Sequence, residues 1–157
     1  MKKIIISPYS RPLRDGKRNA KNYPWWEELI DQLKKTGEYH ITQIGRTGEI
    51  LLKNIDETKF NLSFDELKNL VNSCDIWLSV DNFFPHFCKA YNLKSGIVLW
   101  GRSDPEIFGY PTNINLLKDR KNLRPDQYNI WEAIEYSKDV FVTPDIILIE
   151  VKKLEHI

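Results

Sequence analysis

Short apolar runs alternate with amphipathic segments along most of the chain. The runs at 3–7, 39–45, 75–80 and 96–100 are rich in β-branched and aromatic residues, which predicts buried strands. The segments at 25–37, 64–74, 83–91 and 144–154 carry apolar residues at helical spacing. This alternation predicts an α/β fold, a Rossmann-like domain with a parallel sheet flanked by helices.

Capping signals support the predicted helices. Ser63 and Glu66 form a capping box before the second helix. Pro24 suits the first turn of the first helix, and Gly37 is a typical stop. Thr143, followed by proline and aspartate, predicts the start of the last helix.

The remaining segments are less regular. Residues 49–53 predict a short strand or an extended segment, 106–112 turns, and 113–117 an edge strand. Residues 118–129 are a polar loop, and 130–137 are a helical turn or an irregular packed segment. No repeat or linker interrupts the pattern, so we expect one domain over 1–157.

Composition excludes several classes of function. The net charge of +1 provides no global basic field for a nucleic-acid partner. No run approaches ~18 apolar residues, and the chain enters its first strand too soon for a signal peptide. Cys74 and Cys88 lack metal-binding spacing and predict buried free thiols of a reducing compartment. We therefore expect a cytoplasmic protein with no membrane span, metal or cofactor.

Polar residues gather where two predicted strands end, within a βαβ unit at 74–105. Ligands of parallel sheets bind beyond these carboxyl ends. The candidates are Asp81, Asn82 and His86 after one strand, and Gly101, Ser103 and Asp104 after the next. Each also has a structural interpretation: Asp81 as a helix cap, His86 as a packed residue, and the Ser-Asp-Pro sequence as a common turn.

The loop at 8–22 is long and basic, and it leads from a strand into a helix. Backbone donors at a helix start, together with Ser10, Lys17 and Lys21, suit a phosphate or pyrophosphate. The alternative is that these side chains are simply solvated. No glycine-rich dinucleotide motif, Walker motif, zinc motif or nucleophile elbow occurs. The residues alone thus point to a small anionic, nucleotide-like ligand.

Five short motifs, taken in order, carry a more specific signal. They are KNYP (21–24), GRTGE (45–49), DNFFPH (81–86), GRSDP (101–105) and VTPDII (142–147). Across nearly the whole chain this pattern resembles the C-terminal, nucleotide-sugar-binding half of family 9 glycosyltransferases, the ADP-heptose:lipopolysaccharide heptosyltransferase group. The resemblance implies one of the two Rossmann-like domains of a GT-B fold.

The resemblance also implies roles for individual residues. Lys21 would contact the donor phosphate together with Ser10, Lys17 and the helix start at Asn82, Phe83 and His86. Glu49, with Asp81, would hold the ribose or base. Gly101, Ser103 and Asp104 would set the strand-end loop.

Two departures limit what the resemblance implies. Asn82 and Phe83 stand where the family has a small residue and a glycine, and this phenylalanine reshapes or crowds the approach to the pyrophosphate. The acceptor site and catalytic base of the family belong to an N-terminal domain outside these residues, so no catalytic residue is assigned.

Three functions remain open at this point. The chain is the donor-binding half of a glycosyltransferase, completed by a partner chain, by self-association or by a further domain. Alternatively, it is a stand-alone module that binds a nucleotide or nucleotide-sugar without turnover. A structural remnant that binds nothing is the third possibility.

Overall fold

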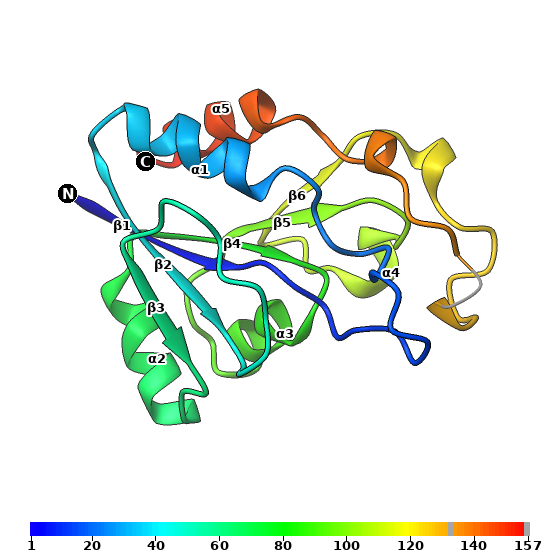
Figure 1. The fold of residues 1–157 in the computed structure, drawn as a ribbon, viewed down its shortest axis with the longest axis horizontal. Coiled ribbons are helices and arrows are strands. Elements are labelled where there is room, and N and C mark those ends of the chain that lie inside the picture. Colours follow the sequence, from blue (N-terminus) through cyan, green and yellow to red (C-terminus); the bar gives the residue numbers. More distant parts are fainter. Residues whose placement is uncertain (132–133, 156–157) are drawn as a thin grey trace.

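The computed structural model describes residues 1–131 and 134–155, and one six-stranded sheet forms its centre (Figure 1). The strand order is β3-β2-β1-β4-β5-β6, and all neighbouring strands are parallel. The strands are β1 (Lys2–Ser7), β2 (Tyr39–Gly45), β3 (Glu57–Phe60), β4 (Ile76–Val80), β5 (Ile97–Trp100) and β6 (Ile114–Leu117). The predicted α/β class is confirmed.

Helices cover both faces of the sheet. The main ones are α1 (Trp26–Lys35), α2 (Phe64–Ser73), α3 (Phe83–Ala90) and α5 (Pro144–Leu154). Figure 1 shows α1 and α5 above the sheet and α2 and α3 below it. Short helical turns follow β5 and β6, namely α4 (Pro105–Phe108), η1 (Arg120–Asn122) and η3 (Lys138–Val140). None of the helices within the described ranges is long and apolar enough to cross a membrane.

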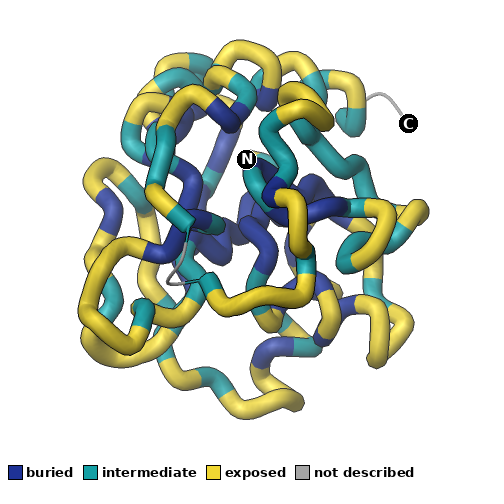
Figure 2. The backbone as a smooth tube through the Cα atoms, turned by 90° about the vertical axis from the view of Figure 1, so that its right-hand side faces the viewer, coloured by how far each residue is buried: buried dark blue, intermediate teal, exposed yellow. Residues whose placement is uncertain are grey.

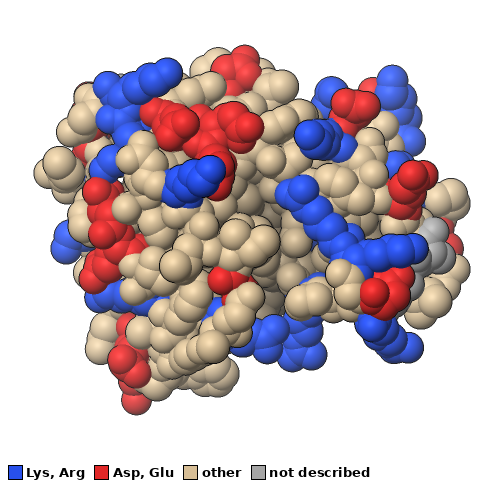
Figure 3. All heavy atoms as spheres, in the orientation of Figure 1, with Lys and Arg blue, Asp and Glu red and all other residues tan. Residues whose placement is uncertain are grey.

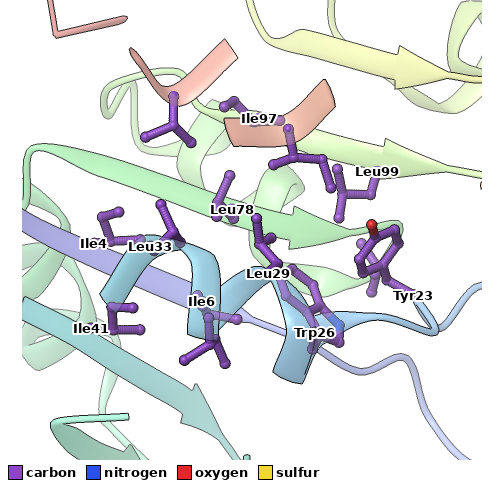
Figure 4. Packing of buried hydrophobic residues seen from close by; sticks show 14 of the residues in the cluster. Ile4, Ile6, Tyr23, Trp26, Leu29, Leu33, Ile41, Leu78, Ile97 and Leu99 are labelled. Atoms are coloured by element: carbon purple, nitrogen blue, oxygen red, sulfur yellow. The ribbon is translucent and has the colours of Figure 1, made fainter. Parts of the chain in front are cut away.

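Each strand supplies alternate side chains to two separate cores. In β1, Ile4 and Ile6 pack under α1 and α5, whereas Ile5 packs against α2 and α3. Figure 4 shows the first core, where Leu78 of β4 lies beside Leu29 of α1. Because both faces are covered, β4 and β5 are buried along their whole length and β1 is buried from Ile4 to Ser7, and exposed loops surround these strands in Figure 2.

The right-handed rule for parallel crossovers explains which face each connection takes. The chain moves outward from β1 to β2 through α1, and from β4 to β5 in the opposite direction through α3. Opposite directions place the connecting helices on opposite faces. The β2–β3 connection has no helix, yet its Leu52 joins the core under α1, as the same rule requires.

The predicted helix signals are confirmed with two differences. Pro24 lies before the helix and not in its first turn, because α1 begins at Trp26 with Trp25 at the N-cap position. Ser63 and Glu66 form the expected capping box, and Gly37 takes a left-handed conformation (φ 72°) just after α1. Thr143 precedes α5 as predicted, but its hydroxyl pairs with the Asp145 carboxylate instead of accepting a backbone N–H.

The connection between β2 and β3 differs most from the sequence expectation. Residues 49–53 form no strand; the edge strand is β3, at Glu57–Phe60. The buried Gln43 side chain instead holds this loop, donating to the Ile50 carbonyl (2.9 Å) and accepting from the Leu52 N–H (2.9 Å). The predicted edge strand at 113–117 is confirmed as β6, and the turns at 106–112 include most of α4. The prediction for 130–137 falls partly on 132–133, outside the described residues.

Candidate functional site

A cavity of about 650 Å³ opens beyond the carboxyl ends of β1, β2 and β4. This volume lies in the range typical of small-molecule sites. Its lining comes from the loops after these strands and from the first turns of α2 and α3: Ser7, Tyr9, Ser10, Arg11, Asn19, Lys21, Ile44, Gly45, Arg46, Glu49, Lys59, Asn61, Leu62, Phe64, Leu67, Asp81, Asn82, Phe83, Phe84 and His86.

The topology determines this position. Strands β1 and β4 are neighbours, but their outgoing connections run to opposite sides of the sheet. Such a switch point leaves a crevice between the diverging loops, which is where α/β sheets bind ligands.

The basic loop after β1 folds back onto the end of β4. The Lys21 Nζ lies 3.2 Å from the Asp81 carboxylate, and both side chains are mostly shielded, with 23% and 10% exposed. The Ser10 hydroxyl donates to the Asp81 carbonyl (2.6 Å). Lys21 also lies 4.8 Å from the centre of the Trp131 ring. The ammonium group is therefore held at the cavity wall by a carboxylate and an aromatic face.

Asn82 joins β1, β4 and α3. Its amide nitrogen donates to the Ser7 hydroxyl (2.9 Å) and to the Tyr9 carbonyl (3.2 Å). Its amide oxygen accepts from the Ser79 hydroxyl (3.0 Å) and from the Phe84 N–H (2.9 Å), which makes Asn82, not Asp81, the cap of α3. The side chain expected to contact phosphate is thus already engaged within the protein.

Glu49 lies at the β2 side of the cavity. Its carboxylate folds over Gly45, where an added Cβ would come within 2.1 Å of it. Burial raises the pKa of Glu49, against a smaller lowering effect from the Arg46 backbone. The Gln43 side chain holds the backbone that follows Glu49 through its hydrogen bonds to Ile50 and Leu52. The Glu49 carboxylate is therefore carried by a loop with a defined backbone conformation.

His86 is exposed on α3 and faces the cavity. Its Nδ1 lies 2.6 Å from the Tyr110 hydroxyl, and the two rings meet edge to face. His86 is therefore not in the core, while its contact with Tyr110 is consistent with a structural role as well as with a place in the cavity wall.

Several predicted site residues lie outside the cavity lining. Lys17 is exposed and pairs with Asp15 at 3.6 Å. Gly101 packs under Phe141, because a Cβ there would come within 2.8 Å of that ring. A glycine is therefore needed at position 101 for internal packing, and not for the close approach of a ligand.

Ser103 and Asp104 belong to a loop network after β5. Ser103 is buried, and its hydroxyl has no hydrogen-bond partner in the described part of the chain. Asp104 accepts two hydrogen bonds from Arg120 (2.8 and 3.1 Å) and caps α4. Arg120 consequently lowers the pKa of Asp104. Asp104 thus holds the loop after β5 through Arg120 and α4, and neither Ser103 nor Asp104 lines the cavity.

The structure adds residues that the sequence did not single out. Lys59 lies in β3 and Asn61 directly after it, Phe64 begins α2, and Arg46 follows β2. Lys59 and Asn61 were missed because β3 was not recognised, so its carboxyl end could not be placed beside the others. The cavity lining has more cations than carboxylates, whereas basic and acidic side chains are interspersed over the face in Figure 3.

The chemistry available in the cavity is binding of an anion that carries a polar or aromatic group. Among residues 1–131 and 134–155, no group of three or more metal-ligating side chains occurs. Of the two carboxylates in the lining, Asp81 is paired with Lys21, and burial raises the pKa of Glu49.

Comparisons with known proteins identify the fold. No protein-family model and no curated protein sequence matches the chain. Among solved structures, the chain is similar to an Escherichia coli ADP-heptose lipopolysaccharide heptosyltransferase II (TM-score 0.68, 18% identity, 98% of this chain, 46% of that chain).

Two further structures agree. The E. coli heptosyltransferase WaaC, solved with ADP, has TM-score 0.64 at 16% identity, covering 98% of this chain and 44% of its own. A family 9 glycosyltransferase from Veillonella parvula has TM-score 0.71 at 12% identity, covering 98% and 46%. The chain spans less than half the length of each. Its fold is that of a Rossmann-like part of the GT-B glycosyltransferases, as in these heptosyltransferases.

Proposed function

We propose that the cavity binds the diphosphate of a nucleotide-sugar resembling ADP-heptose, and that the chain is the donor-binding half of a glycosyltransferase. One observation carries this proposal. Lys21, Asp81 and Glu49, which lie far apart in the sequence, converge on one cavity at the switch point of a heptosyltransferase-like fold.

Lys21 has the central role in this proposal. A bound diphosphate would compete with Asp81 for the Lys21 ammonium, which already lies at the cavity wall. In a transfer reaction, the fixed cation would stabilise charge that develops on the departing diphosphate. Ser10 and the N-terminal end of α3 add donors and a favourable dipole, while Glu49 accepts from a ribose hydroxyl.

Transfer also requires a base beside the acceptor hydroxyl. We assign this base to no residue of the cavity lining; a partner chain, a second copy or a further region would supply the acceptor site. A cytoplasmic location is part of the proposal, because buried free thiols suit a reducing compartment.

Calorimetric titration tests the donor site. We expect saturable binding of at least one of ADP, UDP, GDP or CMP, or of a sugar conjugate of these. Lys21→Ala should weaken it about tenfold or more, as expected for a charge-assisted contact of ~1.5–3 kcal/mol. Glu49→Ala should also weaken binding. Lys17→Ala is the matched control, because Lys17 is a lysine of the same loop outside the cavity. Absence of binding by every nucleotide, or an equal effect of Lys17→Ala, would refute the proposal.

A stand-alone binding module is the second candidate. The engagement of the Asp81 carboxylate by Lys21 favours it, because a carboxylate held in an ion pair is not free to accept a proton from an acceptor hydroxyl. Release of nucleoside diphosphate from sugar donors by the isolated chain distinguishes the two. Binding without sugar-dependent release supports the module, or a transferase that needs its other half.

A further inference from the structure

We infer that Phe83 and Phe64 form an aromatic wall against which the planar base of a nucleotide ligand stacks. The inference rests on the proposed function, and it gives the nucleoside part of the same ligand a contact surface. Both rings line the cavity, and both are more than half exposed, at 56% and 54%.

The wall is rigid for local reasons. Phe64 is the first residue of α2 and Phe83 the first of α3, and each directly follows a residue whose side chain caps its helix. The two rings stack at 5.9 Å between centroids with 20° between their planes. Phe87 is buried behind them, 5.4 Å from Phe64 and 5.5 Å from Phe83. Exposed aromatic faces are thus held in place before any ligand arrives.

The cavity lining is chemically mixed. Lys21, Ser10 and Asp81 meet where the loop after β1 folds onto the end of β4. Apolar side chains from β2, from the loop before α2, and from the first turns of α2 and α3 also line it: Ile44, Leu62, Phe64, Leu67 and Phe83. A ligand that contacts both groups must combine an anionic part with a flat apolar one, and a nucleoside diphosphate has this combination.

The stacking distance indicates how the base would lie. Insertion between two rings needs roughly 7 Å, twice the ~3.4 Å spacing of stacked bases. The Phe64–Phe83 separation of 5.9 Å is too small for that. The base therefore lies on the cavity-facing side of the wall, not between its rings.

The test separates the base from the phosphates. Binding of a nucleoside diphosphate and of inorganic pyrophosphate is measured by calorimetry for wild type, Phe83→Ala and Phe83→Tyr. Base stacking is worth ~1–3 kcal/mol, so Phe83→Ala should weaken nucleoside diphosphate binding about tenfold. Phe83→Tyr, which keeps the ring, should bind as wild type does. Pyrophosphate affinity should stay within about twofold in both variants.

Tyr91→Ala is the matched control. Tyr91 belongs to the same aromatic cluster, 4.9 Å from Phe87, and is 42% exposed, but it does not line the cavity. This variant should bind nucleotide normally. Circular dichroism on each variant verifies folding. We expect Phe83→Ala to fold, because the Phe83 side chain is more than half exposed.

Four results would overturn the inference, and a fifth would overturn the proposed function. Phe83→Ala could leave nucleotide affinity unchanged, or weaken pyrophosphate equally, which would make its effect unspecific. Sedimentation could show a wild-type oligomer that Phe83→Ala dissociates, in which case the wall is a protein interface. If wild type binds pyrophosphate and nucleotide equally well, the base-stacking inference is wrong while the proposed phosphate site is still supported. If wild type binds neither, the proposed function itself fails.

Discussion

Asn82 shows how one side chain can serve the architecture instead of the ligand. Its side-chain hydrogen bonds tie the end of β1 to the end of β4 and cap α3. An asparagine at a strand end predicts polarity there, but the acceptors on Ser7 and Tyr9 come from a segment more than seventy residues away. The phosphate contact predicted for Asn82 stays untested, and its amide is already satisfied internally.

Glu49 gives the cavity a pH-dependent element. In the unfolded chain a glutamate titrates near ~4.3, and burial raises its pKa in the fold. Between these two values the folded state binds more protons, so the free energy of unfolding falls as pH rises. The loss is complete above the folded pKa.

Urea unfolding of wild type and Glu49→Gln at about pH 4 and about pH 7 measures this effect. We expect wild type to lose more stability than the variant over this interval, because glutamine does not ionise. The same pH dependence in both proteins would exclude Glu49 as its source.

At the scale of elements, local signals were sufficient where a short segment determines its own structure. The capping box at Ser63, the stop at Gly37 and the apolar strands were all predictable, since caps and buried runs act within a few residues. Strand β3 was not, because its ETKF sequence is polar and lies at the sheet edge. Its place is determined by pairing with β2 and by Asp56, which accepts from the Ile41 N–H (2.7 Å).

The loop after β2 depends on Gln43 in a way that can be measured. Gln43→Leu would leave the Ile50 carbonyl and the Leu52 N–H without their partner. Each unsatisfied group costs about 1–3 kcal/mol, so we expect a clear loss of stability. Amide exchange at Leu52 should accelerate more than exchange in β5.

Gln32→Leu, in helix α1, provides a control. Among residues 1–131 and 134–155, no hydrogen bond ties the Gln32 side chain to a loop. This variant should leave Leu52 exchange unchanged. Retention of slow exchange at Leu52 in Gln43→Leu would show that packing of the loop, not the buried amide, holds it.

For the whole molecule, handedness and strand order together place the cavity. Outgoing connections from β1 and β4 must diverge, so a crevice forms at their ends whatever residues line it. The sequence predicted that polar residues would meet there, and Lys21, Asp81 and Glu49 do. Gly101, Ser103 and Asp104 do not, because β5 lies one strand beyond the switch point.

Gly101→Ala distinguishes packing from ligand approach. An added Cβ would come within 2.8 Å of Phe141 and 2.9 Å of Val140, on the segment that leads into α5. Overpacking of this kind costs about 1–3 kcal/mol, measured as a lower midpoint of urea unfolding. Nucleotide affinity should not change in the folded variant. A loss of nucleotide affinity with unchanged stability would instead show that Gly101 takes part in ligand binding.

The two native thiols have a practical consequence. Cys74 and Cys88 are buried, and burial raises their pKa values to about 11 and about 12. Since the thiolate is the reactive form, neither competes for a maleimide at neutral pH in the folded protein. A cysteine introduced at exposed Tyr128 would therefore accept a fluorophore or spin label selectively, without removal of either native thiol.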